Sequence, residues 1–393
     1  MATEEILQTL PQTVSMETLR QWMVDGAPVT VLDVRPLADR SEWAIPGSVH
    51  VDAYDALWAR DPRALDAAEL PRDRTIVTVC AAGRTSLLAS TLLRSRGIPA
   101  CSLEGGMKAW SGAWNLAEVP VPGLGARVIQ VRRTGKGCLS YVVAADGNAA
   151  VIDASVQPEV YLQIADREGW RIVSVIETHI HADHVSRAHA LAAATDARVF
   201  LPAQKRVSFP HVPVEDGDAI RLGEREGLLR SLRTPGHTRE STCYLLADGA
   251  VLTGDTLFLH GVGRPDLGAG SAAETADTAA SRTAAAETDA RARSLYHSLS
   301  RLRALPGDTV VLPGHTSEPT PFDGAPHAAP LARVIAENPA LSLDQKALVA
   351  LLTAGGRATP RNHEQIIRYN EMGAAPMEDP TDLEFGANRC AVG

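Results

Sequence analysis

Histidine and aspartate side chains gather in the second half of the sequence, most densely in the run Thr178–His184, THIHADH. In an extended segment His179 and His181 project to the same side, because successive side chains of a strand alternate between its faces. Asp183 and His184 follow where a helix is expected to open, and they reach a neighbouring position. Imidazole and carboxylate groups without a thiolate suit zinc, iron or manganese rather than an iron–sulfur cluster. The run therefore predicts a metal site.

Three further turns carry the same kinds of side chain at the ends of apolar runs: TPGHT, LTGDT and LPGH. The glycine beside each polar residue permits a tight turn that aims the side chain into a common site. A single histidine is more often a surface or core residue, but seven such residues in four turns indicate a shared metal centre. The candidate ligands are His179, His181, Asp183, His184, His237, Asp255 and His315.

A different chemistry is indicated at Cys80. The strand-like run TIVTVC ends at this cysteine, and a helix is expected from near Thr85, after the loop Ala81–Arg84. The N–H groups and the dipole at a helix N-terminus lower the pKa of a thiol and favour its thiolate. Arg84 adds a cation for an anionic sulfur donor. An isolated cysteine is commonly only a small buried hydrophobe, so it is the loop around Cys80 that predicts a nucleophile.

The candidate metal ligands and Cys80 both lie in segments where strand and helix patterns alternate. Runs 29–34 and 75–80 are typical of buried strands, and run 86–97 is typical of an amphipathic helix ended by a glycine. Farther on, three strand patterns (ARVIQV, CLSYVVA and NAAVIDA) precede a helix over 159–168 and a strand over 171–178. This order predicts an α/β chain, with a parallel sheet first and antiparallel pairing at the start of the second half.

The chain has 393 residues, which is enough for two or three domains. The Pro- and Gly-rich run 119–126, VPVPGLGA, is typical of a linker, so we expect one domain over 13–118 and another over 127–343. The run 268–290 is small, polar and free of aromatic residues, which predicts a surface insertion, partly helical through its alanines. Residues 344–393 are expected to form a helix and a tail that either covers the second domain or makes a homodimer contact.

Four short motifs stand in the first domain: Asp33-Val34-Arg35-Pro36, Ile45-Pro46-Gly47-Ser48, Leu103-Glu104-Gly105-Gly106 and Ala109-Trp110. With them, the segment 14–114 resembles a rhodanese-like sulfurtransferase domain, built on a parallel sheet. The resemblance implies that Cys80 takes a sulfane sulfur as a persulfide and passes it to an acceptor thiol. It also implies that Arg84 assists catalysis and that Gly83 and Thr85 bind substrate. Many members have arginine where Thr85 stands, so thiosulfate and a persulfide both stay open as donors.

The second domain, over 126–338, resembles the metallo-β-lactamase fold, an αββα sandwich, because His179–His184 matches its HxHxDH motif and the later ligands follow in order. Two subfamilies fit. Glyoxalase II-type thioesterases use all seven ligands for two zinc ions and hydrolyse with a bridging hydroxide. Persulfide dioxygenases of the ethylmalonic encephalopathy protein type hold one Fe(II). The resemblance places that ion on His179, His237 and Asp255, with open positions for persulfide and O₂.

The flanking segments and the fusion favour the dioxygenase. A sulfurtransferase in the same chain makes or consumes the persulfide that such a site oxidises. Pro265 and Thr316-Ser317 depart from the dioxygenase pattern near the substrate, which leaves the thiol carrier open. The segments that resemble dioxygenase motifs are Gly254–Phe258, Gly261–Leu267, Leu295–Leu299 and Glu337–Leu341.

We therefore predict a persulfide dioxygenase, which oxidises a low-molecular-weight thiol persulfide to sulfite with one Fe(II) and O₂, coupled to sulfur transfer through Cys80. Its partners would be glutathione or another small thiol, thiosulfate or sulfite, and O₂. Arg264 would bind substrate and Asp183 would act in catalysis. The remaining site residues would orient ligands and shuttle protons, or hold a second metal; they are His181, Asp183, His184 and His315.

Two alternatives stay open. The first is a dinuclear zinc thioester hydrolase, of the hydroxyacylglutathione hydrolase kind, with an accessory rhodanese domain. The second is a non-enzymatic persulfide carrier or sensor.

The composition excludes some classes of function. A net charge of -9 argues against nucleic acid and anionic membranes as partners. The acidic N-terminus does not resemble a signal peptide, and no apolar run approaches the roughly 18–20 residues that span a bilayer. Five widely spread cysteines are not a disulfide framework. We therefore expect a cytoplasmic protein with neither nucleic acid nor membrane partners.

Overall fold

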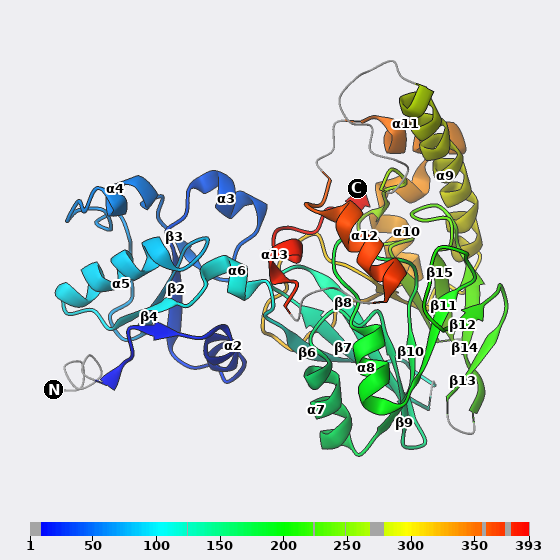
Figure 1. The fold of residues 1–393 in the computed structure, drawn as a ribbon, viewed down its shortest axis with the longest axis horizontal. Helices are drawn as coiled ribbons and strands as arrows, with labels where there is room; N and C mark the ends of the chain where they lie inside the picture. The colour runs from blue at the N-terminus through cyan, green and yellow to red at the C-terminus, as the bar shows by residue number, and fades with distance from the viewer. Residues whose placement is uncertain are drawn as a thin grey trace.

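The computed structural model describes residues 9–123, 125–222, 225–247, 249–267, 279–355, 359–373 and 379–392. These residues form two α/β domains, the first on the left of Figure 1 and the second on the right. No helix among them is both long and apolar enough to cross a bilayer.

The first domain contains the expected parallel sheet, with five strands in the order β1-β5-β4-β2-β3. Helices follow the strands, which buries the central strands on both faces and explains the continuous apolar run of β4. The strands are β1 (Thr13–Val14), β2 (Val29–Asp33), β3 (Val49–His50), β4 (Thr75–Val79) and β5 (Ala100–Leu103). The helices are α2 (Met16–Val24), α3 (Leu37–Glu42), α4 (Tyr54–Trp58), α5 (Arg84–Ser95) and α6 (Gly106–Trp110).

The second domain has two large sheets. The seven-stranded sheet runs β12-β11-β10-β9-β8-β7-β6, and the six-stranded sheet runs β13-β14-β15-β16-β18-β19. The first sheet comprises β6 (Asn115–Val119), β7 (Arg127–Arg133), β8 (Cys138–Ala145), β9 (Asn148–Ile152), β10 (Arg171–Ile176), β11 (Arg198–Pro202) and β12 (Val212–Val214). The second comprises β13 (Ala219–Leu222), β14 (Arg225–Arg233), β15 (Thr242–Leu246), β16 (Ala250–Gly254), β18 (Val310–Pro313) and β19 (Ala329–Pro330).

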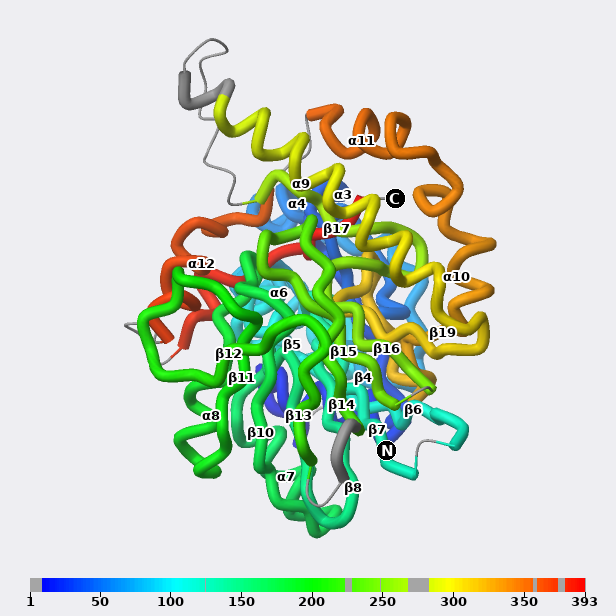
Figure 2. The backbone as a smooth tube through the Cα atoms, turned by 90° about the vertical axis from the view of Figure 1, so that its right-hand side faces the viewer, coloured from blue at the N-terminus to red at the C-terminus, as the bar shows by residue number. Residues whose placement is uncertain are grey.

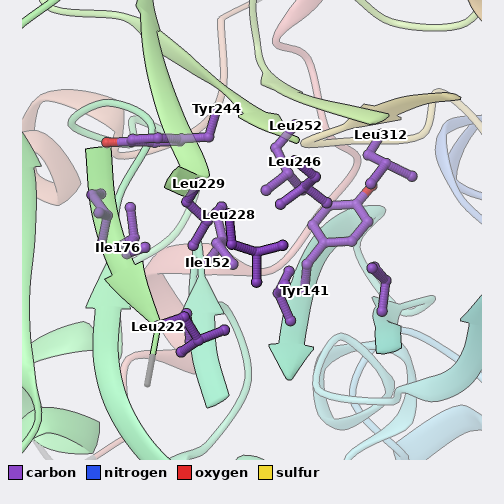
Figure 3. Close-up of a cluster of buried hydrophobic side chains, with 14 of the residues drawn as sticks. Tyr141, Ile152, Ile176, Leu222, Leu228, Leu229, Tyr244, Leu246, Leu252 and Leu312 are labelled. Carbon is purple, nitrogen blue, oxygen red and sulfur yellow. The ribbon is translucent and has the colours of Figure 1, made fainter. Parts of the chain in front are cut away.

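An apolar core joins the two sheets. Tyr141 and Ile152 of the first sheet meet Tyr244 and Leu252 of the second, as Figure 3 shows. Helices cover the outer faces: in Figure 2, α8 lies to the left of the strands and α10 to the right. This arrangement confirms the αββα sandwich. The helices are α7 (Pro158–Glu168), α8 (Ala188–Thr195), α9 (Ala279–Arg303), α10 (Leu331–Glu337), η1 (Pro339–Ser342), α11 (Gln345–Thr353), α12 (His363–Met372) and α13 (Thr381–Glu384).

The Pro- and Gly-rich run 119–126, which we expected to be a linker between domains, instead connects β6 to β7 within one sheet. Asn115 pairs with Arg132 and Val119 pairs with Val128 across that antiparallel ladder. A connection between paired strands uses the same turn-forming residues as a linker, which is why composition alone could not distinguish them.

The regions expected to be an insertion and a tail have definite places. Residues 268–278 of the expected insertion lie outside the described residues, and residues 279–290 are the first turns of α9. The tail covers the second domain, because β20 (Ala391–Val392) pairs with β17 (Val262–Gly263) and the side chain of Cys390 packs against Ala182 and Leu267.

Candidate metal centre and cysteine loop

The predicted ligands come from loops at one edge of the sandwich. The loop after β10 carries His179–His184, and those after β14, β16 and β18 carry His237, Asp255 and His315. The loops touch through glycine: a Cβ on Gly263 would lie 1.9 Å from the carbonyl oxygen of Asp255. Close packing of these turns therefore brings all seven predicted residues together, buried.

His179, His237 and Asp255 form the first group. The Asp255 Oδ2 atom lies 3.9 Å from Nε2 of His179 and 3.5 Å from Nε2 of His237. All three atoms are buried without a hydrogen-bond partner. Unpaired buried polar atoms are costly, so three of them converging within 4.8 Å fit a metal ion.

The imidazole rings of His179 and His237 are oriented by hydrogen bonds at their Nδ1 atoms. Nδ1 of His237 lies 2.9 Å from the carbonyl oxygen of Arg264, and Nδ1 of His179 lies 2.9 Å from Oγ1 of Thr178. Burial lowers the pKa of both imidazoles. Burial alone would raise the pKa of Asp255, but His315 and the other imidazoles bring it below its ordinary value. Neutral imidazoles and an ionised carboxylate are the forms that bind metal.

Asp183, His184 and His315 form a second group, together with Cys138. His315 bridges two carboxylates: its Nε2 lies 2.8 Å from Asp183 and its Nδ1 lies 2.5 Å from Asp255. The thiol of Cys138 lies 3.3 Å from Asp183. The sequence predicted a ligand set without thiolate, and the structure adds the thiol of Cys138 beside this group. Cys138 opens β8, and no motif marks it; its backbone bridges to that of His315.

His181 belongs to a third group, with Asp153 and Glu177. Its Nε2 lies 2.8 Å from Glu177 and 3.3 Å from Asp153, whereas its Nδ1 is buried and unpartnered. The ring lies 4.2 Å from that of His179, centroid to centroid, so the two stay neighbours as their spacing predicts. Asp153 and Glu177 were not predicted from the sequence, because their only signal is their position directly after β9 and β10.

Arg264 does not present its guanidinium as a substrate ligand in this structure. The side chain is buried and bonds to Asp266 and to the carbonyl oxygen of Arg389. Its own carbonyl oxygen accepts the hydrogen bond from His237. Arg264 therefore orients a candidate ligand and anchors the tail.

A cavity of about 400 Å³ opens beside His237. Three arginines line it, and two of them pair with acidic residues on its rim: Arg206 with Glu371, and Arg239 with Glu287. The third, Arg291, is buried, and burial lowers its pKa to about 10. Two carboxylates thus offset two of the three cations in the lining.

The C-terminal segment packs against the candidate metal centre. Asn388 donates to the carboxylate of Asp183 at 3.0 Å. Glu384 accepts from the backbone N–H of Val185 and pairs with Arg133 and Arg187 at 2.7 and 2.8 Å. These contacts were not predictable from sequence, because nearly 200 residues separate the partners.

We expect Glu384→Gln to destabilise the fold by about 3–5 kcal/mol, because it leaves two buried guanidinium groups without their charge partner. Burial alone would raise the pKa of Glu384, but Arg133 and Arg187 lower it to about 2. A lowered folded-state pKa means that the stabilisation is present above the ordinary value of 4.5 and is lost as the pH falls toward 2. Urea unfolding at pH 7 and pH 3 measures it.

The matched control for this variant is Glu337→Gln, which removes an exposed carboxylate paired with Arg333. An exposed pair is worth under about 1 kcal/mol, so this variant should unfold nearly as the parent does. Equal losses in both variants would contradict the buried-pair argument for Glu384.

The Cys80 loop has the expected form. The thiol accepts hydrogen bonds from the N–H of Gly83 at 3.1 Å and from the hydroxyl of Ser86 at 3.3 Å. Burial alone would raise the pKa of Cys80, but these donors lower it below its ordinary value. Gly106 packs against the loop so closely that a Cβ there would lie 2.2 Å from the carbonyl oxygen of Cys80. The loop is therefore preformed to stabilise a thiolate.

The other predicted loop residues differ in their exposure to solvent. Arg84 is exposed at the start of α5 and can meet an anionic donor, and Gly83 supplies one N–H to the sulfur. Thr85 is buried, with 2% of its surface exposed, so substrate contact through its side chain stays a prediction. Ser86, the side-chain donor to the sulfur, was not predicted from the sequence.

Two family models match the chain. The metallo-beta-lactamase superfamily matches residues 133–315, and the rhodanese-like domain matches residues 15–113. A hydroxyacylglutathione hydrolase from Maricaulis maris is 37% identical over 172 residues, 43% of this chain and 57% of the relative. One from Rhodopseudomonas palustris is 32% identical over 213 residues, 53% of this chain and 71% of the relative. The chain thus spans little more than half of the first relative's length.

Two solved structures are also similar. A metallo-beta-lactamase from Staphylococcus aureus has a TM-score of 0.52 at 24% identity, covering 67% of this chain and 74% of that one. ETHE1 from Myxococcus xanthus has a TM-score of 0.49 at 26% identity, covering 62% of this chain and 96% of that one. Fold and site together define a metal-binding αββα sandwich preceded by a parallel-sheet domain whose Cys80 sulfur accepts hydrogen bonds from the loop around it. The chain belongs to the metallo-beta-lactamase superfamily and carries a rhodanese-like domain ahead of that fold.

Proposed function

We propose that this protein is a persulfide dioxygenase with its own sulfurtransferase domain. The overall reaction is R–S–SH + O₂ + H₂O → R–SH + SO₃²⁻ + 2H⁺, in which the terminal sulfur is oxidised and O₂ is reduced. The observation that carries the proposal is the group of His179, His237 and Asp255, two imidazoles and one carboxylate with three unpartnered atoms. Such a set leaves coordination positions open for two reactants.

The hydrogen bonds of His315 support a single metal in that group. This imidazole is held by Asp183 on one side and by Asp255 on the other. Its two nitrogens are thereby engaged with carboxylates, whereas Nε2 of His179 and Nε2 of His237 have no hydrogen-bond partner. Nε2 of His184 in the second group has none either, an observation that favours the dinuclear alternative.

An Fe(II) ion held by His179, His237 and Asp255 would bring persulfide and O₂ to one centre and mediate electron transfer between them. The chain's own residues supply the rest. Because Arg206 and Arg239 already pair with Glu371 and Glu287, Arg291 at the mouth would bind a carboxylate of the thiol. The Asp183–His315 pair holds a proton between Oδ2 and Nε2, 2.8 Å apart, beside the ligand Asp255, and can exchange it with product. Burial of the whole group excludes bulk water.

A dinuclear zinc thioester hydrolase is the second candidate, and a specific observation favours it. Cys138, Asp183, His184 and His315 could hold a second ion, since one donor atom from each lies within 4.8 Å of the others. The relatives named hydroxyacylglutathione hydrolase point the same way.

Oxygen uptake separates the two candidates. Protein loaded anaerobically with Fe(II) is expected to consume O₂ when glutathione persulfide is added and to release one sulfite for each O₂. Zinc-loaded protein is expected to leave a hydroxyacylglutathione unhydrolysed. Hydrolysis of that thioester with two zinc ions per chain, and no O₂ uptake with any persulfide, would make the hydrolase the better assignment.

A further inference from the structure

A cavity of about 290 Å³ lies between the two domains, beside the Cys80 loop. On the first domain it is lined by residues that follow three neighbouring strands: Arg35 after β2, Ala81 after β4 and Met107 after β5. Ligands of parallel α/β sheets bind at this carboxyl edge. Ala81 directly follows Cys80, so the cavity begins one residue from the nucleophile.

The opposite wall comes from the second domain. Lys136, Arg361 and Arg389 line it. Arg389 belongs to the C-terminal segment whose neighbouring residue Asn388 bonds to Asp183 of the metal centre. The same short segment thus borders the cavity on one side and the metal centre on the other.

The interface around the cavity is tightly packed. The indole N–H of Trp43 donates to the carbonyl oxygen of Thr134 in the second domain. A Cβ on Gly135 would lie 1.8 Å from the carbonyl oxygen of Trp110. These two contacts hold the domains against each other, so both walls of the cavity are already in place and the site is preformed. Its volume is near the lower end of the roughly 300–1,000 Å³ range of small-molecule sites.

The charged residues that line the cavity are Arg35, Asp39, Glu42, Lys136, Arg361, Glu384 and Arg389. Because Arg35 pairs with Asp33 and Glu384 pairs with Arg133 and Arg187, Arg361 and Arg389 are the candidates for binding a carboxylate ligand. Arg389 pairs across the domain boundary with Glu42 at 3.2 Å, and the two side chains are 30% and 51% exposed. An exposed pair of this kind contributes under about 1 kcal/mol, so a ligand carboxylate can take the place of Glu42. Arg361, whose guanidinium lies 5.7 Å from the ring centre of Phe385, adds a second cation.

We propose that this cavity binds a carboxylate-bearing, low-molecular-weight thiol as the sulfur acceptor of Cys80, with its carboxylate at Arg389 and Arg361. Beforehand, the Cys80 thiolate takes the sulfane sulfur of a donor such as thiosulfate, which leaves as sulfite. The transfer is then Cys80–S–SH + R–S⁻ → Cys80–S⁻ + R–S–SH. The acceptor thiolate attacks the terminal sulfur, and the electron pair of the broken S–S bond returns to Sγ, where Gly83 and Ser86 stabilise it.

This inference deepens the proposed function, because it places the formation of the persulfide substrate between the domains. It rests on that function only for the later fate of the product. The test therefore uses sulfur transfer from thiosulfate without added iron or O₂, a reaction that proceeds or fails independently of the dioxygenase.

Three acceptors are compared in the full chain: glutathione, cysteamine (a thiol without a carboxylate) and cyanide. Arg389→Gln is expected to raise the KM for glutathione roughly three- to tenfold, the value of a half-exposed charged hydrogen bond. Arg361→Gln should act in the same direction. Rates with cysteamine and cyanide stay at the parent level, which also shows that the variants fold. Arg63→Gln, at an exposed arginine of the first domain, is the matched control.

Glu42→Gln distinguishes recognition from a structural role. It frees Arg389, so the KM for glutathione is expected to fall. If the Glu42–Arg389 pair only holds the domains together, Glu42→Gln and Arg389→Gln must change that KM in the same direction. Such a result, or an unchanged KM in Arg389→Gln, would overturn the proposal.

Discussion

His237→Ala is expected to reduce persulfide-dependent O₂ uptake by more than roughly a hundredfold, because loss of even the hydrogen-bond partners of metal ligands costs 10–100-fold. His237 contributes one of the three unpartnered atoms of the first group, and alanine leaves only His179 and Asp255. Iron content after anaerobic loading should fall with the activity. Sulfur transfer from thiosulfate to cyanide should persist, since the Cys80 loop lies in the other domain.

Two further histidine variants make this result specific. His297→Ala removes an exposed imidazole on α9 and should leave uptake and iron content unchanged. His315→Ala should slow uptake while the iron stays bound, because in the proposed centre His315 bonds to Asp183 and Asp255 and exchanges a proton but does not hold the iron. If His315→Ala instead released one of two bound metals per chain, the dinuclear assignment would replace the mononuclear one. Full uptake in His237→Ala would remove the first group from the chemistry altogether.

The positions of the candidate metal ligands were predictable because each follows a strand and three of them, His237, Asp255 and His315, lie beside a glycine. Gly254 and Gly314 show why: a Cβ at Gly254 would lie 2.5 Å from Oγ1 of Thr178, and one at Gly314 would lie 2.7 Å from Oδ1 of Asp255. Only glycine lets these turns lie so close to the neighbouring loops, so each glycine is a local signal in the sequence that two loops are in contact there.

The division of the ligands into three groups was not predictable. It depends on which strands become neighbours, and Cys138, Asp153 and Glu177 join the centre from β8, β9 and β10 without any motif of their own. The contacts of Asn388 and Glu384 are likewise set by where the C-terminal segment packs. Patterns within a sequence indicate elements, whereas such contacts depend on the tertiary arrangement.

The boundary between the domains shows the same limit. The run of Pro and Gly at 119–126, which predicted a linker between the domains, connects β6 to β7 within the second domain. Whether the strand before the turn belongs to the first or the second domain is decided by edge pairing: Leu116 and Glu118 pair with Val131 and Ile129 of β7. That partner lies in the second domain, so the second sheet begins before the position where composition placed the boundary.

Cys80→Ser is expected to lower sulfur transfer from thiosulfate by roughly a thousandfold or more, as loss of a catalytic nucleophile does elsewhere. The hydrogen bonds from Gly83 and Ser86 can stabilise a thiolate at neutral pH, but an alcohol stays protonated there.

Ser86→Ala should lower sulfur transfer less than Cys80→Ser does. Because it removes a donor that lowers the pKa of Cys80, the pH midpoint of transfer should move upward. Cys101, a buried strand residue whose pKa burial raises to about 12, serves as the control in Cys101→Ala, which should keep the transfer rate.

The same Cys80→Ser variant tests whether the two domains work in sequence. With glutathione persulfide supplied directly, O₂ uptake should equal that of the parent, because the metal centre is unaltered. With thiosulfate and glutathione supplied instead, the parent should consume O₂ and the variant should not, because only Cys80 can make the persulfide from these two reactants. If the variant consumed O₂ from thiosulfate and glutathione as fast as the parent, sulfur would reach the metal centre without Cys80. The rhodanese-like domain would then have a separate task in the same chain.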